Sequence, residues 1–438
     1  MVTRVVITAA GVVSPIGTGL ERFSEALRGG VSGGGPITLF DSSGFPTQIA
    51  CEVDGFDPQA PFATLMERVP ALHTAVMPRQ DRKTAFGLAA ALGCVEQSGI
   101  APEALTGEPC ALHVGTGLSS VTVEQLEADM MPFLDERGRY DQAAFGEHAL
   151  WRPSPSPWRH ITSEANRLIV AALGIEGPTT SNFSACAASL QAVGRAYRDI
   201  QAGRVRRALA GGMDSMAHPF GMISFIRLGA LSTANDDPKR ASRPFDKERD
   251  GFVLGEGGAM VMLESLEAAR ERGATILAEV LGYGTSIDAY MVTAPHPEGH
   301  GARLAIQRAV RDAGVALGEV DYVNAHGTAT PLNDSTESRA IGSVWREAGL
   351  EAPPVSSTKS MTGHLIAAAG VLEAVACVAA LRGGFLPPSI NITEQDPECD
   401  VPVVNASAGV DADVRIAMTN SFGFGGQNGV MLFKRWEG

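Results

Sequence analysis

Small and apolar residues repeat from Ser181 to Gly203 with the period of one buried helix face. The positions of that face are Ala187, Leu190, Val193, Tyr197 and Ile200. Gly203 stands where a left-handed helix end is expected. The pattern therefore predicts a buried helix that begins near Cys186, among small neighbours that let a ligand come close.

The rest of the chain alternates between short apolar runs typical of buried strands and longer patterns typical of helices. Strands are expected at residues 2–7, 48–53, 110–115, 207–211, 259–263, 276–282, 321–324, 354–356, 416–420 and 429–433. Helices are expected at residues 20–27, 82–98, 163–173, 265–272, 302–313 and 333–348, and in a small-residue segment ending near residue 382. The alternation predicts an α/β fold of mostly parallel sheets covered by helices.

The alternation occurs twice, with a boundary near Glu267. We therefore predict two halves, residues 1–266 and 267–438, which suits the length of 438 residues. In each half a functional-looking loop follows a strand. Residue identities alone do not reveal a duplication, because the halves share little beyond this rhythm.

The segment from Glu124 to Trp158 departs from the alternation. It combines a charged turn with a run of prolines and serines, and prolines at positions 153, 155 and 157 preclude a regular helix or a central strand. Trp151 and Trp158 in such a loop favour a lid or an interface. A surface excursion whose rings merely cover the domain is the alternative.

Composition narrows the classes of function. A net charge of −14 argues against a general nucleic-acid binder. Six scattered cysteines without a CxxC pair argue against a disulfide framework or a zinc site. The apolar run at the start is too short for a signal peptide, and no stretch approaches the roughly 20 uninterrupted apolar residues of a membrane span. We expect a soluble, cytoplasmic protein with no metal.

Three side chains occupy positions suited to nucleophilic chemistry. Cys186 at a helix N-terminus is expected to have a lowered thiol pKa, because free amides and the helix dipole favour the thiolate. An ordinary buried cysteine is the alternative. His326 follows a strand and His364 opens a helix, which are the places where α/β folds bind ligands. A structural hydrogen bonder is the alternative for each histidine, but together the three residues make a Cys/His/His constellation plausible.

The sequence NSFGFGGQN, residues 420–428, is a fourth candidate part of the catalytic site. Its glycines allow backbone amides to approach a reacting atom, so that one amide here and the amide of Cys186 could form an oxyanion hole. A tight hairpin is the alternative. No G-x-G-x-x-G nucleotide motif stands between a strand and a helix.

Several long motifs now occur in one order. They are the Cys186 helix, GGMDS, SRPFDKERDGFVLGEGG, SIDAY-x-x-TAP, NAHGTATPLND, KSMTGH and NSFGFGGQN. In this order they resemble the β-ketoacyl-carrier-protein synthases, and most closely the stand-alone elongating (FabF-like) enzymes of the thiolase superfamily. The resemblance covers almost the whole chain and implies a five-layered αβαβα thiolase fold of two similar halves, normally a homodimer.

The resemblance also implies residue roles. Cys186 would hold an acyl group taken from the phosphopantetheine arm of an acyl carrier protein. His326 and His364 would promote loss of CO2 from a malonyl thioester and stabilise the enolate, with at least one neutral ring donating a hydrogen bond. Lys359 and Glu373 would form a pair that sets protonation near His364, or a salt bridge that holds the fold, or both.

Further residues carry over by the same resemblance. Thr328 and Thr330 would hydrogen-bond the pantetheine arm, and Thr293 and Phe225 would belong to the substrate site. Phe422 would be the gate beside the cysteine, and its amide would join that of Cys186 in the oxyanion hole. The family requires no cofactor beyond the arm that arrives with the substrate.

Two departures from the family pattern are visible. Met291 stands where many relatives have histidine after DAY, so the rate or the acyl preference is expected to differ. The segment at residues 124–158 is longer than in typical fatty-acid enzymes, which predicts a reshaped pocket and a specialised pathway.

Basic contacts for an acidic carrier protein could come from two clusters, each of which could equally be a solvated face. The clusters are Arg79, Arg82 and Lys83, and Arg204, Arg206 and Arg207. Two competing functions remain. A thiolase would carry a second cysteine in the glycine-rich C-terminal turn, and a non-condensing partner subunit of a heterodimeric synthase would usually lack the active-site cysteine.

Overall fold

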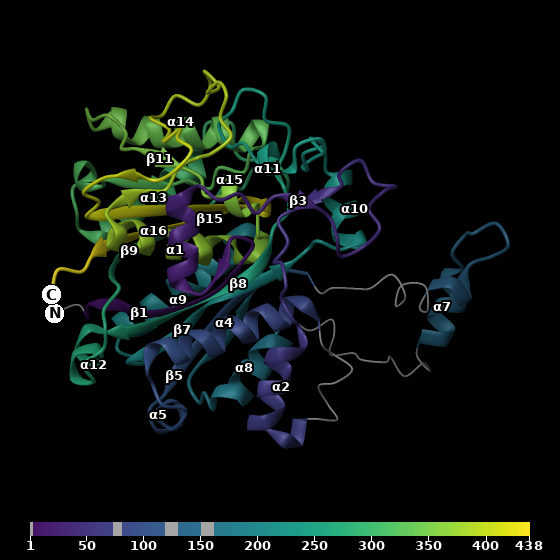
Figure 1. Cartoon of the computed structure of the whole chain (residues 1–438), viewed down its shortest axis with the longest axis horizontal. Helices are drawn as coiled ribbons and strands as arrows, with labels where there is room; N and C mark the ends of the chain where they lie inside the picture. The colour runs from purple at the N-terminus through teal and green to yellow at the C-terminus, as the bar shows by residue number, and fades with distance from the viewer. Residues whose placement is uncertain (1–2, 73–80, 119–129, 150–161) are drawn as a thin grey trace.

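The computed structural model describes residues 3–72, 81–118, 130–149 and 162–438 (Figure 1). Ten of the strands in this part of the chain lie side by side in the order β6-β5-β7-β8-β1-β9-β15-β14-β10-β11, and β2 pairs with β1 as the eleventh strand of the sheet. The N-terminal half contributes β1 (Val5–Ser14), β2 (Gly17–Thr18), β5 (Cys110–Thr116), β6 (Thr179–Asn182), β7 (Arg207–Ser215) and β8 (Glu256–Ser265). The C-terminal half contributes β9 (Ala278–Ile287), β10 (Tyr322–Asn324), β11 (Val355–Ser356), β14 (Ile416–Gly423) and β15 (Gln427–Arg435). Two small sheets pair β3 (Gly35–Pro36) with β4 (Ile49–Ala50), and β12 (Phe385–Leu386) with β13 (Val410–Asp411).

The two halves repeat one topology. In the first half β5 is parallel to β6 and β7, while β8 is antiparallel to β7 and β1. In the second half β10 is parallel to β11 and β14, while β15 is antiparallel to β14 and β9. The order and direction of the strands therefore show that the two halves share one fold, although their residue identities do not. The expectation of mostly parallel sheets is wrong, because β8 and β15 each run antiparallel to both of their neighbours, and β1 is antiparallel to β9.

Strands β1 and β9 are antiparallel neighbours and join the two half-sheets edge to edge. The predicted division at residues 266 and 267 falls at the start of α12, in the connection between β8 and β9, and stays a prediction.

Helices complete five layers (Figure 1). Helices α4 and α8 cover the outer face of the N-terminal strands, α13 and α14 cover the outer face of the C-terminal strands, and α9 and α16 lie between the two sets. The helices among the described residues of the first half are α1 (Leu20–Gly29), α2 (Gln59–Arg68), α4 (Arg82–Ser98), α5 (Pro102–Gly107), α7 (Gln142–Ala149), α8 (Glu164–Leu173), α9 (Ala188–Gln201), α10 (Pro219–Arg227), α11 (Pro238–Ala241) and α12 (Leu266–Glu271). Those of the second half are α13 (His300–Ala313), α14 (Pro331–Glu347), α15 (Lys359–Thr362) and α16 (Ala369–Gly383). The αβαβα thiolase architecture is thus confirmed.

Local sequence explains helix α4, whose bounds match the prediction. The side chain of Asp81 accepts a hydrogen bond from the amide of Thr84 at 2.7 Å and caps the first turn. Gly99, with φ 68°, ends the helix in the left-handed conformation that glycine adopts without strain.

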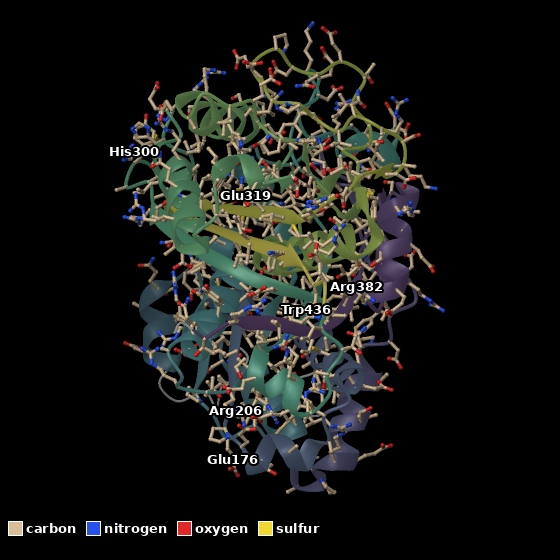
Figure 2. The ribbon with its side chains drawn as sticks, turned by 90° about the vertical axis from the view of Figure 1, so that its left-hand side faces the viewer. Glu176, Arg206, His300, Glu319, Arg382 and Trp436 are labelled. Carbon is tan, nitrogen blue, oxygen red and sulfur yellow. The ribbon has the colours of Figure 1, made fainter. Side chains whose placement is uncertain are left out.

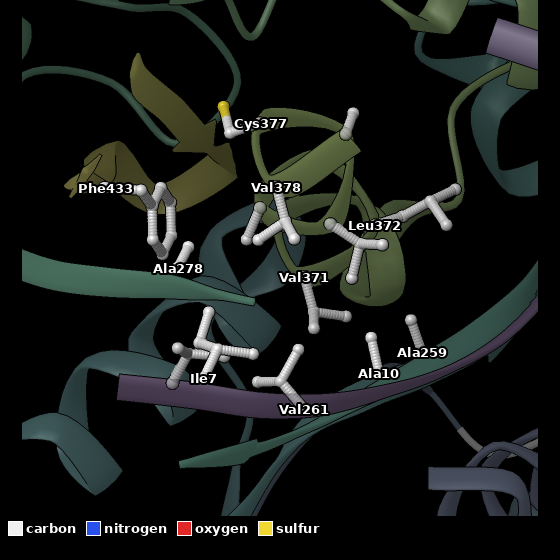
Figure 3. Packing of buried hydrophobic residues seen from close by; sticks show 14 of the residues in the cluster. Ile7, Ala10, Ala259, Val261, Ala278, Val371, Leu372, Cys377, Val378 and Phe433 are labelled. Atoms are coloured by element: carbon white, nitrogen blue, oxygen red, sulfur yellow. The ribbon is translucent and has the colours of Figure 1, made fainter. Parts of the chain in front are cut away.

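Helix α16 fills the centre of the molecule. The segment Ile366–Gly383 is long and apolar enough to cross a membrane by composition, but 89% of it is buried inside the protein. Figure 3 shows Val371 and Val378 of this helix beside Ile7 of β1 and Val261 of β8 in one apolar cluster. The apolar stretch is therefore accounted for as a core helix.

The described part of the unusual segment packs on itself. The ring of Phe145 in α7 lies 5.3 Å from that of Phe133 and 5.6 Å from that of Tyr140. Figure 1 shows α7 beside the body of the molecule, away from both sets of strands. Trp151 and Trp158 lie outside the described residues, so the reshaped pocket stays a prediction.

Candidate active site

Cys186 lies where the predicted helix begins. It belongs to a single 3-10 turn, η5 (Ala185–Ala187), that leads directly into α9. The preceding Ala185 has φ 47°, a left-handed conformation that non-glycine residues seldom adopt. The five predicted face positions of α9 and its entry are all buried. The Cys186 side chain is 5% exposed, at the floor of a cavity.

The thiol of Cys186 does not have the lowered pKa expected from its place at a helix start. Burial raises the pKa of the Cys186 thiol to about 12, against the opposing effects of the Lys359 charge and of the Phe424 amide, which donates a hydrogen bond to the sulfur. Desolvation penalises the thiolate more than these groups favour it. The resting form is therefore a thiol.

His364 faces the sulfur, with its Nε2 atom 3.2 Å from Cys186 Sγ. Its other nitrogen, Nδ1, accepts a hydrogen bond from the amide of Ile366 at 3.2 Å. A ring nitrogen that accepts carries no proton, so the neutral ring holds its proton on Nε2. Burial, helped by the charge of Lys359, holds the pKa of His364 well below its usual range. The residue is thus a neutral donor aimed at the sulfur.

His326 reaches the same point from the end of strand β10. The two histidine rings have centroids 5.3 Å apart, and donor atoms of Cys186, His326 and His364 all lie within 4.8 Å of one another. Lys359 Nζ lies 3.2 Å from His326 Nδ1, so the ammonium donates there and the His326 proton is also on Nε2. Burial, with help from Lys359 and His364, holds the pKa of His326 well below its usual range.

The lysine–glutamate pair contacts His326 directly and influences His364 only through the charge of Lys359. Lys359 Nζ donates to Glu373, and also to the backbone oxygen of His326 at 2.6 Å. The pair therefore touches His326 and not His364, because α15 runs beside the end of β10. Burial raises the pKa of Glu373 to about 7, opposed by the charge of Lys359. The pair is a buried salt bridge that also fixes the His326 ring, and its role in setting protonation near His364 stays a prediction.

Two carboxylates that the sequence analysis did not single out hold the His326 loop. Glu337 accepts hydrogen bonds from the amides of His326 and Gly327, each at 2.8 Å. Asp334 accepts from the amides of Thr328 at 2.9 Å and Ala329 at 3.1 Å. Both lie on the first turns of α14, directly after the loop, so acidic residues at that spacing were the available signal.

The second amide near the sulfur belongs to Phe424, two residues after the predicted Phe422. Phe424 opens the 3-10 turn η8 (Phe424–Gly426), where Gly425 and Gly426 have positive φ and turn the chain towards Cys186. Phe422 lies within β14, with its ring 6.1 Å from that of His326. Both phenylalanines line the cavity. The two share one SFGFGG motif, so sequence spacing alone did not distinguish them.

A cavity of about 410 Å³ connects these groups with the surface. Thr293, Thr328 and Thr330 line it, as predicted for the substrate site. Phe225 is buried one layer behind, with its ring 5.4 Å from that of Phe252, which does line the cavity. Met291 is 54% exposed and its neighbour Val292 lines the cavity in its place.

The Cys/His/His cluster is close enough to hold a metal ion, but its protonation opposes one. A metal would need a lone pair on each Nε2, whereas both Nδ1 atoms accept hydrogen bonds and leave the protons on Nε2. The donor set therefore fits an anionic oxygen better than a cation.

The first predicted basic cluster does not offer a docking surface in its described members. Arg82 forms a salt bridge with the buried Glu256, and Lys83 is 5% exposed with Nζ donating to the backbone oxygen of Leu118 at 2.9 Å. Both side chains bind partners within the protein, so the expectation that these two residues contact a carrier protein is wrong. Arg79 lies outside the described residues.

The second basic cluster lies far from the cavity. Arg204 and Arg206 form salt bridges with Asp199 and Glu271, and Arg207 is buried against Glu108. The cluster follows the C-terminal end of α9, whereas Cys186 precedes its start. Figure 2 shows Arg206 at the opposite end of the molecule from His300, whose neighbour Gly299 lines the cavity.

Known proteins are similar in sequence to this chain along nearly its whole length. Residues 2–269 match the model of the "Beta-ketoacyl synthase, N-terminal domain" and residues 277–393 that of the "Beta-ketoacyl synthase, C-terminal domain". The chain is 39% identical over 432 residues to 3-oxoacyl-[acyl-carrier-protein] synthase 2 of Coxiella burnetii, covering 99% of this chain and 98% of that protein. It is 38% identical over 434 residues to the protein of the same name from Synechocystis, with the same coverage.

Solved structures of β-ketoacyl synthases are also similar to this chain. The ishigamide ketosynthase/chain length factor is similar over 100% of both chains, with a TM-score of 0.84 and 36% identity. A β-ketoacyl synthase from Burkholderia phymatum is similar over 99% of this chain and 100% of its own, with a TM-score of 0.84 and 29% identity. With these relatives and with a cysteine facing two neutral histidines, the chain belongs to the β-ketoacyl synthase family.

Proposed function

We propose that this protein catalyses the decarboxylative condensation of an acyl group held on Cys186 with a malonyl group on a carrier protein. The observation that carries the proposal is the neutral Nε2–H donor of His364 at 3.2 Å from the Cys186 sulfur, with the neutral His326 ring beside it in the same cluster. That arrangement suits a reaction in which negative charge develops on a carbonyl oxygen beside a sulfur nucleophile.

In the first step the sulfur of Cys186 attacks the acyl thioester carbonyl. The C–S bond to the phosphopantetheine arm breaks, and the arm leaves as a thiol with the proton from Cys186. The Phe424 amide, already hydrogen-bonded to the sulfur, and the Cys186 amide are the donors for the oxyanion of this step. No external base or cofactor is needed, because the departing thiolate accepts the proton.

In the second step the malonyl thioester occupies the emptied arm site along Thr328 and Thr330. The bond to the carboxylate breaks, CO2 leaves, and the electron pair passes to the thioester oxygen between His326 and His364. The resulting enolate carbon forms a bond with the acyl carbonyl, and the C–S bond to Cys186 breaks. The Cys186 thiolate released in this way takes a proton from solvent water, which restores the thiol. Donation from neutral rings stabilises the enolate without transferring a proton to it.

The carrier protein is the expected partner, in either fatty-acid or polyketide synthesis. In the AntDE:AntF complex, a type II PKS acyl-carrier protein is bound to its ketosynthase, and the matching chain shares 28% identity with this chain at a TM-score of 0.81. Arg227 is the basic residue that we assign to this contact, since it is exposed at the end of α10 beside Leu228 and Gly229, which line the cavity. Arg227→Glu should raise KM for malonyl-carrier protein but not for malonyl-pantetheine.

We further propose a cytoplasmic homodimer. Strand β6 is the outermost strand of the N-terminal half and pairs only with β5 among the described strands, and its residues are exposed or half-buried. An edge strand of this kind can pair with a second copy. Light scattering should give twice the chain mass, and Ser181→Pro should shift the protein towards the monomer.

The decisive test is intact-protein mass after incubation with a panel of acyl-carrier proteins, with Cys186→Ala as control. An acyl adduct that the variant lacks, together with CO2 release from malonyl-carrier protein, is the expected result. A folded protein that neither takes an acyl group nor releases CO2 would refute the condensation and favour the non-condensing partner subunit. Acylation by coenzyme A esters with no response to carrier proteins would favour the thiolase.

A further inference from the structure

The GGMDS motif places a buried carboxylate beside the active site, where it has no part in the steps above. Asp214 is the last residue but one of strand β7 and is fully buried. Its Oδ2 atom accepts a hydrogen bond from the amide of Ala367 at 3.0 Å, and its Oδ1 atom accepts from the amide of Ser215 at 2.9 Å. Asp214 therefore binds the segment that follows His364.

That segment is a strained turn, η7 (Ile366–Ala368). Ile366 has φ 46°, in the left-handed region that β-branched residues rarely adopt. In this conformation the Ile366 amide points back to His364 Nδ1, at 3.2 Å. The neighbouring amide, that of Ala367, is the one that Asp214 holds. A strained conformation persists only where its surroundings fix it, and Asp214 supplies such a contact.

The duplicated topology supports a specific role for this contact. The turns η5 and η7 hold equivalent places in the two halves: each begins with a left-handed residue, Ala185 or Ile366, and each leads into a central helix. Cys186 and Ala367 therefore correspond. In the first half the position carries the nucleophile. In the second half its amide is bound by an internal carboxylate instead.

The residues around Asp214 leave room for its carboxylate and supply an opposite charge near it. A Cβ atom on Gly117 would lie 2.2 Å from Asp214 Oδ2, so glycine is needed for the carboxylate to sit where it does. Lys83 Nζ donates to the backbone oxygen of that same glycine at 3.3 Å and contributes an opposite charge to Asp214. The carboxylate is thus held on three sides, by Ala367, by Gly117 and by the Lys83 charge.

We propose that Asp214 is a positioning residue for His364. Its carboxylate holds η7 in the strained conformation in which the Ile366 amide fixes the His364 proton on Nε2, the atom that faces Cys186. The proposal rests on the proposed function for the consequence of this positioning. The hydrogen bonds themselves do not depend on it.

The test compares Asp214→Ala, which removes the acceptor, with Asp214→Asn, which removes the charge but keeps an oxygen for the Ala367 amide. For malonyl-carrier protein decarboxylation, Asp214→Ala should lower kcat by about 10- to 100-fold, as for a displaced oxyanion donor. KM should stay within about 2-fold, because Thr328 and Thr330 are held separately by α14. Asp214→Asn should recover kcat to within about 3-fold of the natural protein.

The matched control is Asp57→Ala, which removes an exposed carboxylate that accepts an amide at 2.9 Å far from the site. If Asp214→Ala does not fold, Gly117→Ala gives the same perturbation, since the added Cβ displaces the carboxylate. A kcat within 3-fold of the natural value, an equal change in kcat and KM, or an Asn variant as slow as the Ala variant would overturn the proposal.

A second readout needs no carrier protein. Alkylation of Cys186 by iodoacetamide reports on the Nε2–H group that faces the sulfur. With charge equal in the two variants, Asp214→Ala should react about 5-fold more slowly than Asp214→Asn at the same pH. If the natural protein released no CO2, the proposed function would fail. The alkylation ratio would still decide the positioning role, and equal rates would overturn it.

Discussion

Replacing Lys359 with methionine tests the assignment of the His326 donor. The substitution keeps an unbranched side chain as far as the Cε atom but removes the ammonium that donates to His326 Nδ1 and to the His326 backbone oxygen. Without it the imidazole proton can move to Nδ1, and the Nε2–H donor aimed at the enolate is lost. Removing one oriented oxyanion donor costs about 10²- to 10³-fold in kcat, or about 3–4 kcal/mol.

Stability is also affected by this change. Breaking a buried ion pair costs about 3–5 kcal/mol when a charge is left behind. The pKa of Glu373 is already raised to about 7 by burial, so this carboxyl takes up a proton near neutral pH once Lys359 is gone. The loss of unfolding free energy should therefore fall below that range at pH 7, as urea denaturation can measure.

The assay is CO2 release from malonyl-carrier protein, run beside Cys186 acylation followed by mass. Decarboxylation should fall by about 100-fold, and acylation by about tenfold or less, since Lys359 reaches the sulfur only through its charge. Lys247→Met is the control, because it removes an exposed lysine paired with Glu394. Decarboxylation within fivefold of the natural rate, in a folded Lys359→Met variant, would refute the reasoning.

Three further predictions follow from the same geometry. Burial raises the pKa of the Asp214 carboxyl from 3.8 to about 6. The folded protein therefore binds this proton more tightly than the unfolded chain does. As the pH rises from about 4 to about 6, the free energy of unfolding falls, because the unfolded chain releases the proton before the folded protein does. Asp214→Asn should therefore gain about 3 kcal/mol in unfolding free energy relative to the natural protein between pH 4 and pH 7, and an unchanged difference would count against this. Gly423→Ala places a Cβ 3.0 Å from the backbone oxygen of Ser184 and should slow Cys186 acylation by about tenfold, whereas Gly44→Ala, with open space around it, should not. Because burial raises the pKa of Cys186 to about 12, its alkylation rate should keep rising from pH 7 to pH 9, and a plateau below pH 8 would contradict the pKa.

Periodicity and motif order predicted most of the elements and the identity of the reacting groups. The bounds of α4 and the buried face of α9 depend on neighbouring residues in the chain, so they could be derived from it. Cys186, His326 and His364 stood out because each follows a strand or opens a helix among small residues.

Properties set by distant contacts were not predictable in the same way. The pKa of Cys186 depends on complete burial, which no local pattern reports. Lys359 was assigned to the nearer histidine in sequence, His364, but contacts His326, 33 residues away. Arg82 looked like a surface charge until Glu256, 174 residues away, was found beside it.

The site is completed by residues from both halves of the chain, and this has a consequence for biosynthesis. Cys186 lies in the first half, but the Phe424 amide beside it comes from the turn between β14 and β15, the last two strands. A ribosome makes the N-terminal half first. The nucleophile therefore waits, without its amide donor or its histidines, until β15 has inserted between β14 and β9. A nascent chain that lacks β15 therefore has no complete site, and the site forms only after residues of both halves have been made.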